Sequence, residues 1–288
     1  MEKNYRKKIT SLFFKKHEMK NYILLIFVLI TSLCQAEHNV KLYYEQIENG
    51  YNIYADNNEF CPVSIKIDFT VKNLNIEGGN NTVYIVNAKE KKQLLTTLKV
   101  SKTGKAYKFS YTYLTNYGEN NNKTYDKDYV YNLPFNTSNE FKVYQGYNGA
   151  FSHKNKFALD FTMPVGTEIM AIREGIVIKV IEKNNRNCGK KECEKFNNLI
   201  IIYHPDGTFA EYTHIKKNGS EVKVGDKVSK GQRIGYSGNV GWSTGPHLHL
   251  VIFNQNLNGR ETLKTKFKTG DGINIEYLVE KKDYSRQY

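Results

Sequence analysis

Apolar and polar residues alternate along several stretches of the first half of this chain, which is the pattern of half-buried β-strands. Residues 63–71 alternate without interruption, and residues 106–113 place Tyr and Phe side chains on one face. The polar sequence Gly78-Gly79-Asn80-Asn81 predicts a turn before a further strand over residues 82–86. Short strands separated by polar turns predict a small β-sandwich-like domain over residues 37–142.

Residues 143–277 predict a second β-rich domain. Strand patterns cover residues 168–171, 175–181, 199–204, 208–214, 233–237 and 247–253. Pro205-Asp206-Gly207 joins two of these strands as a tight hairpin turn. No helix of convincing length is expected here, so we predict an all-β chain. The charged residues 278–288 are expected to form a frayed tail.

The N-terminus has the composition of an export signal. Residues 23–33 are mostly apolar and follow Lys15, Lys16 and Lys20, and the run is too short for a comfortable membrane span. We expect a signal peptide over residues 1–36, with Met19 as an alternative start. Acylation of Cys34 and an uncleaved membrane anchor are the other two readings of this segment. Each of the three places the rest of the chain outside a bacterial cytoplasm, in the periplasm, at the cell surface or in the medium.

The charge balance favours anionic surroundings such as nucleic acid, lipid headgroups or a cell wall, because Lys and Arg outnumber Asp and Glu by 13. The lysines are scattered, however, and no fold motif for nucleic-acid binding is recognisable, so a nucleic-acid partner is not predicted.

The cysteines allow one local cross-link. Cys188 and Cys193 bracket four residues, and an exported chain permits a disulfide between them. The same spacing is also that of half a zinc site, but the sequence has no second pair to complete one. Cys61 has no evident partner.

Candidate chemistry is concentrated in the histidines of the second domain. His247 and His249 stand two positions apart at the start of a strand pattern, so their side chains share one face. His153 and His214 lie in the same domain, and Asp160 interrupts an apolar run, where a buried carboxylate needs a partner. Two imidazoles and a carboxylate can hold Zn²⁺ with a fourth position open for water, and two further histidines suit proton transfer and oxyanion stabilisation. The remaining histidines are expected to have no part in this chemistry: His17, His38 and His204.

The chain resembles the lysostaphin/LytM-type zinc metalloendopeptidases in three motifs, which are His153…Asp160, Glu211-Tyr212-Thr213-His214 and Ser243-Thr244-Gly245-Pro246-His247-Leu248-His249. The resemblance covers about residues 145–255. It implies a catalytic domain of that type, an antiparallel β-sheet, over residues 143–277, with zinc ligands His153, Asp160 and His249 and catalytic residues His214 and His247. One departure concerns spacing, because six residues separate His153 from Asp160 where three are commonest in the family. The longer spacing resembles a subtype with a similar apolar run before the Asp.

The resemblance also implies an activity, that of an exported zinc endopeptidase hydrolysing peptide bonds in peptidoglycan cross-links or bridges. The alternative is a non-catalytic relative that regulates another cell-wall hydrolase, although this chain keeps every ligand and catalytic position of the family. Four aromatic residues are expected to border the substrate groove: Tyr144, Tyr147, Tyr212 and Trp242. The sequence leaves open the cleaved bond, the oligomeric state and the role of the first domain.

Overall fold

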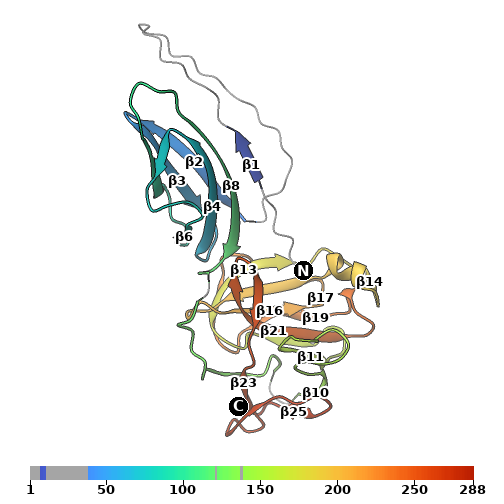
Figure 1. Cartoon of the computed structure of the whole chain (residues 1–288). Helices are drawn as coiled ribbons and strands as arrows, with labels where there is room; N and C mark the ends of the chain where they lie inside the picture. The colour runs from blue at the N-terminus through green and yellow to red at the C-terminus, as the bar shows by residue number, and fades with distance from the viewer. Residues whose placement is uncertain (1–6, 11–37, 121, 137–138) are drawn as a thin grey trace. The chain divides into compact units, whose positions relative to one another are not determined.

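The computed structural model describes residues 7–10, 38–120, 122–136 and 139–288, which divide into two compact units, Met1–Tyr117 and Gly118–Tyr288. Figure 1 shows the strands of each unit. Within these described ranges, no helix has the length and apolar character needed to cross a lipid bilayer. The expected signal peptide, including its apolar core and Cys34, lies outside the described residues apart from Lys7–Thr10.

The first unit has two four-stranded sheets among its described residues, with strand orders β1-β8-β4-β6 and β2-β3-β7-β5. Their strands are β1 (Lys7–Thr10), β2 (Val40–Ile47), β3 (Gly50–Asn57), β4 (Val63–Lys72), β5 (Leu74–Ile76), β6 (Val83–Val86), β7 (Gln93–Val100) and β8 (Lys108–Tyr117). In β4, the alternate residues Val63, Ile65 and Ile67 are fully buried, as the period-2 pattern predicts. Phe109 of β8 contacts Tyr44 and Tyr51 of the other sheet, with ring centroids 5.2 and 4.8 Å away.

The second unit is built on one large sheet, with strand order β18-β13-β15-β16-β21-β11-β10-β25 and β22 paired to β21. The strands of this sheet are β10 (Glu140–Gln145), β11 (Ala158–Thr162), β13 (Gly175–Ile181), β15 (Leu199–Tyr203), β16 (Phe209–Thr213), β18 (Lys227–Val228), β21 (His247–Asn256), β22 (Gly259–Thr262) and β25 (Asp283–Ser285). The smaller elements of the unit are β9 (Val130–Tyr131), β12 (Glu168–Met170), β14 (Asn187–Cys188), the 3₁₀ helix η1 (Lys191–Phe196), β17 (Ile215–Ser220), β19 (Arg233–Ser237), β20 (Gly241–Trp242), β23 (Lys266–Thr269) and β24 (Asn274–Tyr277).

Strand β21 explains why this sheet can carry both a core and a site. Leu248, Leu250 and Ile252 point into a core that also includes Phe161 of β11 and Tyr212 of β16. Because side chains alternate along a strand, His247 and His249 are left on the opposite face. The neighbours of β21 are both antiparallel to it, so their alternate residues line the same two faces.

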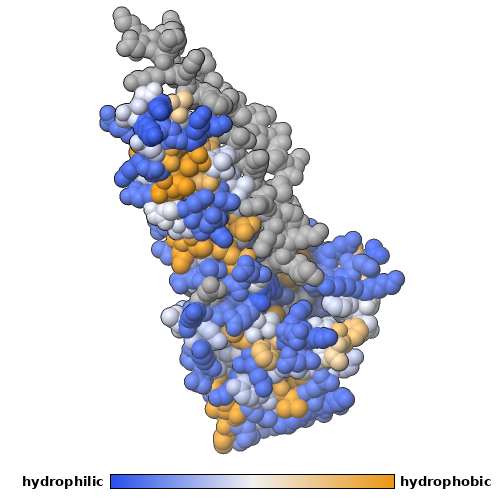
Figure 2. Space-filling view, viewed as in Figure 1, coloured by the Kyte–Doolittle hydropathy of each residue, from blue (hydrophilic) through white to orange (hydrophobic). Residues whose placement is uncertain are grey.

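The structural units differ from the expected domain boundaries. The chain divides after Tyr117 rather than after residue 142, because β9 and β10 pair with strands of the second unit. The tail 278–288 is also not frayed along its length: β25 pairs with β10, and Tyr284 and Arg286 are buried. Figure 2 shows that hydrophilic side chains cover most of the visible surface, as the Lys-rich sequence predicts.

Candidate active site

Strand register brings the first two predicted zinc ligands together. Asp160 of β11 lies directly opposite His249 of β21, and Thr162 lies opposite His247. Residues directly opposite each other in an antiparallel pair project to the same face with Cβ atoms about 5 Å apart. The Nδ1 atom of His249 is 2.8 Å from Oδ1 of Asp160.

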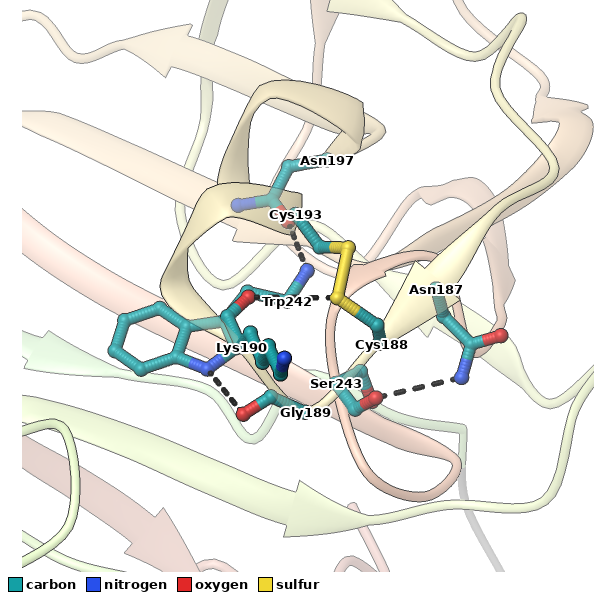
Figure 3. The surroundings of a disulfide bond; sticks show 8 residues. All are labelled: Asn187, Cys188, Gly189, Lys190, Cys193, Asn197, Trp242 and Ser243. Atoms are coloured by element: carbon teal, nitrogen blue, oxygen red, sulfur yellow. Dashed lines mark hydrogen bonds between the residues drawn. A yellow bond between two sulfur atoms is a disulfide. The ribbon is translucent and has the colours of Figure 1, made fainter.

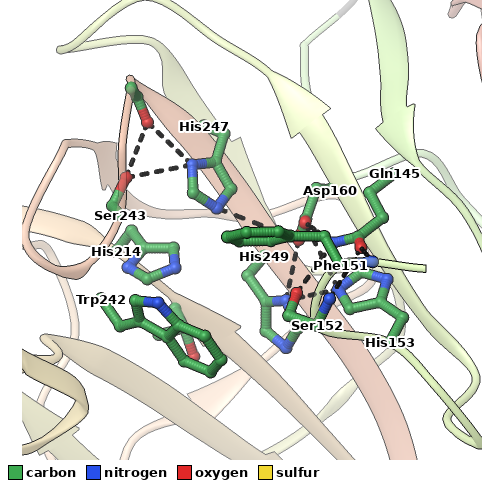
Figure 4. A network of polar contacts seen from close by, with 12 residues as sticks. Gln145, Phe151, Ser152, His153, Asp160, His214, Trp242, Ser243, His247 and His249 are labelled. Carbon is green, nitrogen blue, oxygen red and sulfur yellow. Dashed lines mark hydrogen bonds and ion pairs between the residues drawn. The ribbon is translucent and has the colours of Figure 1, made fainter. Parts of the chain in front are cut away.

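The third predicted ligand, His153, reaches the pair from the loop between β10 and β11. Its Nε2 atom lies 3.3 Å from Oδ2 of Asp160 and 3.3 Å from Nδ1 of His249. Its Nδ1 atom lies 3.0 Å from the carbonyl oxygen of Gly146. A carbonyl only accepts, so Nδ1 carries the proton and the Nε2 lone pair is directed at the other two residues. Figure 4 shows the three side chains converging.

These three side chains fit a metal ion. One ligand atom from each lies within 4.8 Å of the other two, and the set of two imidazole nitrogens and one carboxylate oxygen is one that zinc accepts. Asp160 is almost completely buried. Burial alone raises its pKa, but the contacts with the imidazoles of His153 and His249 more than offset this and hold the pKa well below its ordinary value. The carboxylate is therefore ionised, as a metal ligand must be.

Gln145 supports this arrangement and was not singled out from the sequence. Its amide nitrogen donates to Oδ2 of Asp160 and to the hydroxyl of Ser152, at 2.8 Å each. Its carbonyl accepts from the backbone N–H groups of Phe151 and Ser152. One buried side chain thus orients the carboxylate and also fixes the loop that carries His153. The amide bears no charge and sits at a strand end, so nothing in the local sequence distinguishes it.

His214 and His247 stand beside the three ligands, with ring centroids 4.4 Å apart. Nδ1 of His214 lies 2.6 Å from the carbonyl of Val240, and Nδ1 of His247 lies 2.8 Å from the carbonyl of Gly245. Both Nδ1 atoms are therefore protonated donors, and both Nε2 atoms carry a lone pair. Nε2 of His247 is 3.9 Å from Oδ1 of Asp160.

Burial keeps these two imidazoles neutral. It lowers the pKa of His214 from 6.5 to about 3, with a further contribution from the neighbouring His247. It also lowers the pKa of His247 below its ordinary value. His214 is placed just beyond the end of β16, where its backbone has a φ of 70° and its N–H donates to the carbonyl of Asn198. That turn directs the ring away from the strand and toward His247.

The histidines open into a pocket of about 430 Å³. Of the aromatic residues expected at the groove, Tyr144 and Trp242 line this pocket, and Phe151 lines it as well. The prediction that Tyr212 borders the groove is wrong, because its side chain is completely buried and its hydroxyl accepts a hydrogen bond from the backbone N–H of Ile172. Tyr147 is also not part of the lining, because it packs against the core and its hydroxyl donates to the carbonyl of Thr265.

The other singled-out residues lie away from this chemistry. Cys188 and Cys193 form a disulfide, so the pair is not half of a zinc site. His38 contacts Thr115 in the first unit, and His204 lies 2.8 Å from the carbonyl of Glu174, so both have structural contacts as expected. His17 lies outside the described residues.

Residues 154–261 match Peptidase family M23, a match that begins one position after His153. This part of the chain therefore resembles the peptidases of that family, and the predicted resemblance to lysostaphin/LytM-type enzymes is confirmed. The all-β fold class is confirmed as well, since the described residues form strands and one short 3₁₀ helix.

Three similar proteins illustrate the relatives of this domain. An uncharacterized metalloprotease of Buchnera aphidicola is 37% identical over 42% of this chain and 31% of its own length. The peptidoglycan DD-endopeptidase ShyA of Vibrio cholerae is 42% identical over 32% of this chain and 19% of its own. The glycyl-glycine endopeptidase ALE-1 of Staphylococcus capitis is 41% identical over 36% of this chain and 25% of its own. The chain thus spans less than a third of the length of each of these relatives.

Proposed function

We propose that this chain is an exported zinc endopeptidase that hydrolyses peptide bonds in peptidoglycan. The observation that carries the proposal is the convergence of His153, Asp160 and His249 beside two further neutral histidines, at an open pocket that Asp160, His249 and those two histidines line. A structural metal site would be closed by its ligands, whereas three protein ligands next to a pocket leave a position for water or substrate. Two of the relatives named above are by name a peptidoglycan DD-endopeptidase and a glycyl-glycine endopeptidase.

In this proposal the metal is held by Nε2 of His153, a carboxylate oxygen of Asp160 and Nδ1 of His249. Bound zinc would polarise the scissile carbonyl and lower the pKa of a water molecule toward about 7. Gln145 holds the carboxylate in place through its 2.8 Å hydrogen bond. Burial of the ligand set excludes competing water and strengthens each electrostatic contact.

His214 and His247 are the proposed acceptors and donors of the proton that the attacking water loses. Each has an Nε2 lone pair and a backbone carbonyl that fixes the ring through Nδ1, so each can accept a proton from the attacking water. Once protonated, the same Nε2 atom becomes a donor and can stabilise an oxyanion or deliver the proton to the leaving amine. The two roles therefore need two imidazoles close together, as the 4.4 Å ring separation provides.

Peptidoglycan is proposed as the substrate on three grounds. Two of the three relatives are named for peptidoglycan or for glycyl-glycine, the apolar run at residues 23–33 suits export, and the excess of 13 positive charges suits an anionic wall. The pocket walls carry Tyr144, Phe151 and Trp242, whose rings can pack on a peptide backbone.

The test is digestion of purified peptidoglycan by the purified protein, with mass spectrometry of the released muropeptides to identify the cleaved bond. Activity is expected to disappear with a chelator and to return with added zinc. Asp160→Ala is expected to lose both bound zinc and activity, whereas His247→Ala is expected to keep zinc and lose activity. Full hydrolysis by both variants would overturn the assignment, and a metal-free, inactive wild type would favour the regulatory alternative.

A further inference from the structure

One wall of the pocket is supported by a neighbouring loop that a disulfide closes on itself. Residues 242–246 line the pocket together with Glu194 and Asn197 of the segment 186–197, which pairs with residues 241–242. Strand β14 in the second segment pairs in parallel with β20 in the first. The backbone N–H of Gly241 donates to the carbonyl of Arg186 at 2.8 Å, and that of Ser243 donates to the carbonyl of Cys188 at 3.2 Å. Figure 3 shows Trp242 and Ser243 of the first segment beside the disulfide of the second.

Trp242 is held by the disulfide loop at both its backbone and its ring. Its backbone N–H donates to the side-chain carbonyl of Asn197 at 3.0 Å, and its indole N–H donates to the carbonyl of Gly189 at 3.3 Å. The ring faces Phe151 with centroids 6.2 Å apart, so these two aromatic side chains stand over the pocket from different loops. The position of the indole therefore follows the position of the loop that carries Gly189.

Ser243 continues the contacts from the loop toward a catalytic histidine. Its carbonyl accepts from the side chain of Asn187 at 3.3 Å. Its hydroxyl lies 2.7 Å from the carbonyl of Gly245 and 3.3 Å from Nδ1 of His247. Since Nδ1 of His247 also donates to the carbonyl of Gly245, the hydroxyl is part of the network that sets the ring angle of His247.

Apart from the disulfide and the hydrogen bonds to residues 241–243, the disulfide loop buries little surface of its own. From Gly189 to Lys195, Cys193 is the only buried residue, and the other side chains are exposed and mostly charged. The 3₁₀ helix in the loop is six residues long and its N-terminal residue has no side-chain cap. Such a segment buries too little apolar surface to fix its own conformation.

We propose that Cys188 and Cys193 are positioning residues for this site: their disulfide holds the loop that places Trp242 for peptide binding and, through Ser243, sets the orientation of His247. This inference rests on the proposed function for its catalytic part. Its structural part concerns Trp242 alone and can be tested without any substrate.

The chain provides its own reporter, because Trp242 is the only tryptophan in the sequence. Tryptophan emission of the oxidised full chain is compared with that of the double variant Cys188→Ser/Cys193→Ser. The emission maximum of the variant is expected to move to longer wavelength, since the indole loses its fixed contact with Gly189 and gains water. Bound zinc is expected to stay at one ion per chain, because the three proposed ligands lie outside the loop. The kcat/KM for peptide hydrolysis is expected to fall about 10- to 100-fold, the scale of a misplacement of about 1 Å.

Two further measurements separate the disulfide from other causes. A phosphine reductant is expected to reproduce the emission change in the wild type and to have no effect on the double variant, with bound zinc measured before and after reduction. Asn197→Ala leaves both cysteines in place but removes the side-chain carbonyl that accepts from the backbone N–H of Trp242, so it is expected to shift the emission in the same direction.

The outcomes distinguish the two proposals. Unchanged emission and unchanged kcat/KM after reduction of a folded wild type would overturn the positioning role. A shifted emission in a protein that hydrolyses no peptidoglycan, even with zinc and the disulfide intact, would leave the positioning of Trp242 supported and overturn the proposed function. If the double variant does not fold, reduction of the folded wild type decides the question.

Discussion

The role of Gln145 gives the sharpest quantitative test of the metal centre. Gln145→Met keeps a side chain of similar length but removes the amide that donates to Asp160 and Ser152 and accepts from Phe151 and Ser152. The carboxylate loses one of its fixed donors, and the loop that carries His153 loses its anchor. Both changes allow the ligands to leave the geometry that binds metal.

The expected size of the effect follows from the position of Gln145 next to a ligand. Partners that orient metal ligands are worth about 10- to 100-fold in metal affinity, which corresponds to about 1.4–2.7 kcal/mol. Zinc affinity is measured by competition with a chromophoric chelator at fixed pH. Ser152→Ala removes only one partner of Gln145 and leaves the bond to Asp160, so a smaller loss is expected.

A matched control is available in the first unit. Gln46→Met makes the same chemical change at an exposed position and is expected to leave zinc affinity unchanged. If Gln145→Met bound zinc within about twofold of wild type, the amide would not be orienting Asp160, and the reasoning from the 2.8 Å contact would be refuted.

Three further outcomes are expected. Tyr212→Phe should lower the free energy of unfolding by about 1–3 kcal/mol in denaturant titrations, because the buried Ile172 N–H loses its acceptor. The kcat/KM of this variant should stay within about twofold of wild type, and lost activity with unchanged stability would contradict the structural role of Tyr212. His204→Gln should flatten the pH dependence of stability, because burial lowers the pKa of His204 from 6.5 to about 4 and only the unfolded chain takes up a proton between those values. Between these two pKa values the wild type should lose about 3 kcal/mol more unfolding free energy than the variant as pH falls, at about 1.4 kcal/mol per pH unit. Parallel curves of unfolding free energy against pH for the two proteins would contradict this role of His204. Arg260→Leu should cost about 3–5 kcal/mol, since buried Glu211 loses an ion pair of 2.6 Å, and an unchanged denaturation midpoint would argue against that.

The sequence predicted those parts of the fold that depend on local alternation. The strand patterns at residues 175–181 and 233–237 coincide with β13 and β19, and the hairpin around Pro205 forms between β15 and β16. The shared face of His247 and His249 also follows from period 2 alone. The convergence of all five proposed site residues required the family resemblance, because the sequence separation between His153 and His249 is 96 positions.

The parts that were not predicted depend on long-range pairing. The unit boundary and the ordered tail are set by strands that pair across more than a hundred positions, as β10 does with β25, and no local pattern encodes such a partner. Tyr212 was expected at the groove because it precedes His214 by two positions. However, alternation along β16 points its side chain into the core, and only the turn after Thr213 brings His214 to the site.

The left-handed backbone of His214 carries a strain that the contacts of its own ring offset. A residue other than glycine pays about 1 kcal/mol or more for a φ near 70°, and Gly or Asn adopts this conformation more readily. Replacing His214 by Gly would relieve that strain, but it would also remove a buried ring and the donor to the Val240 carbonyl, so the folded unit is expected to lose stability together with the proposed proton acceptor. The strained turn is therefore held in place by the same imidazole that the proposed chemistry uses.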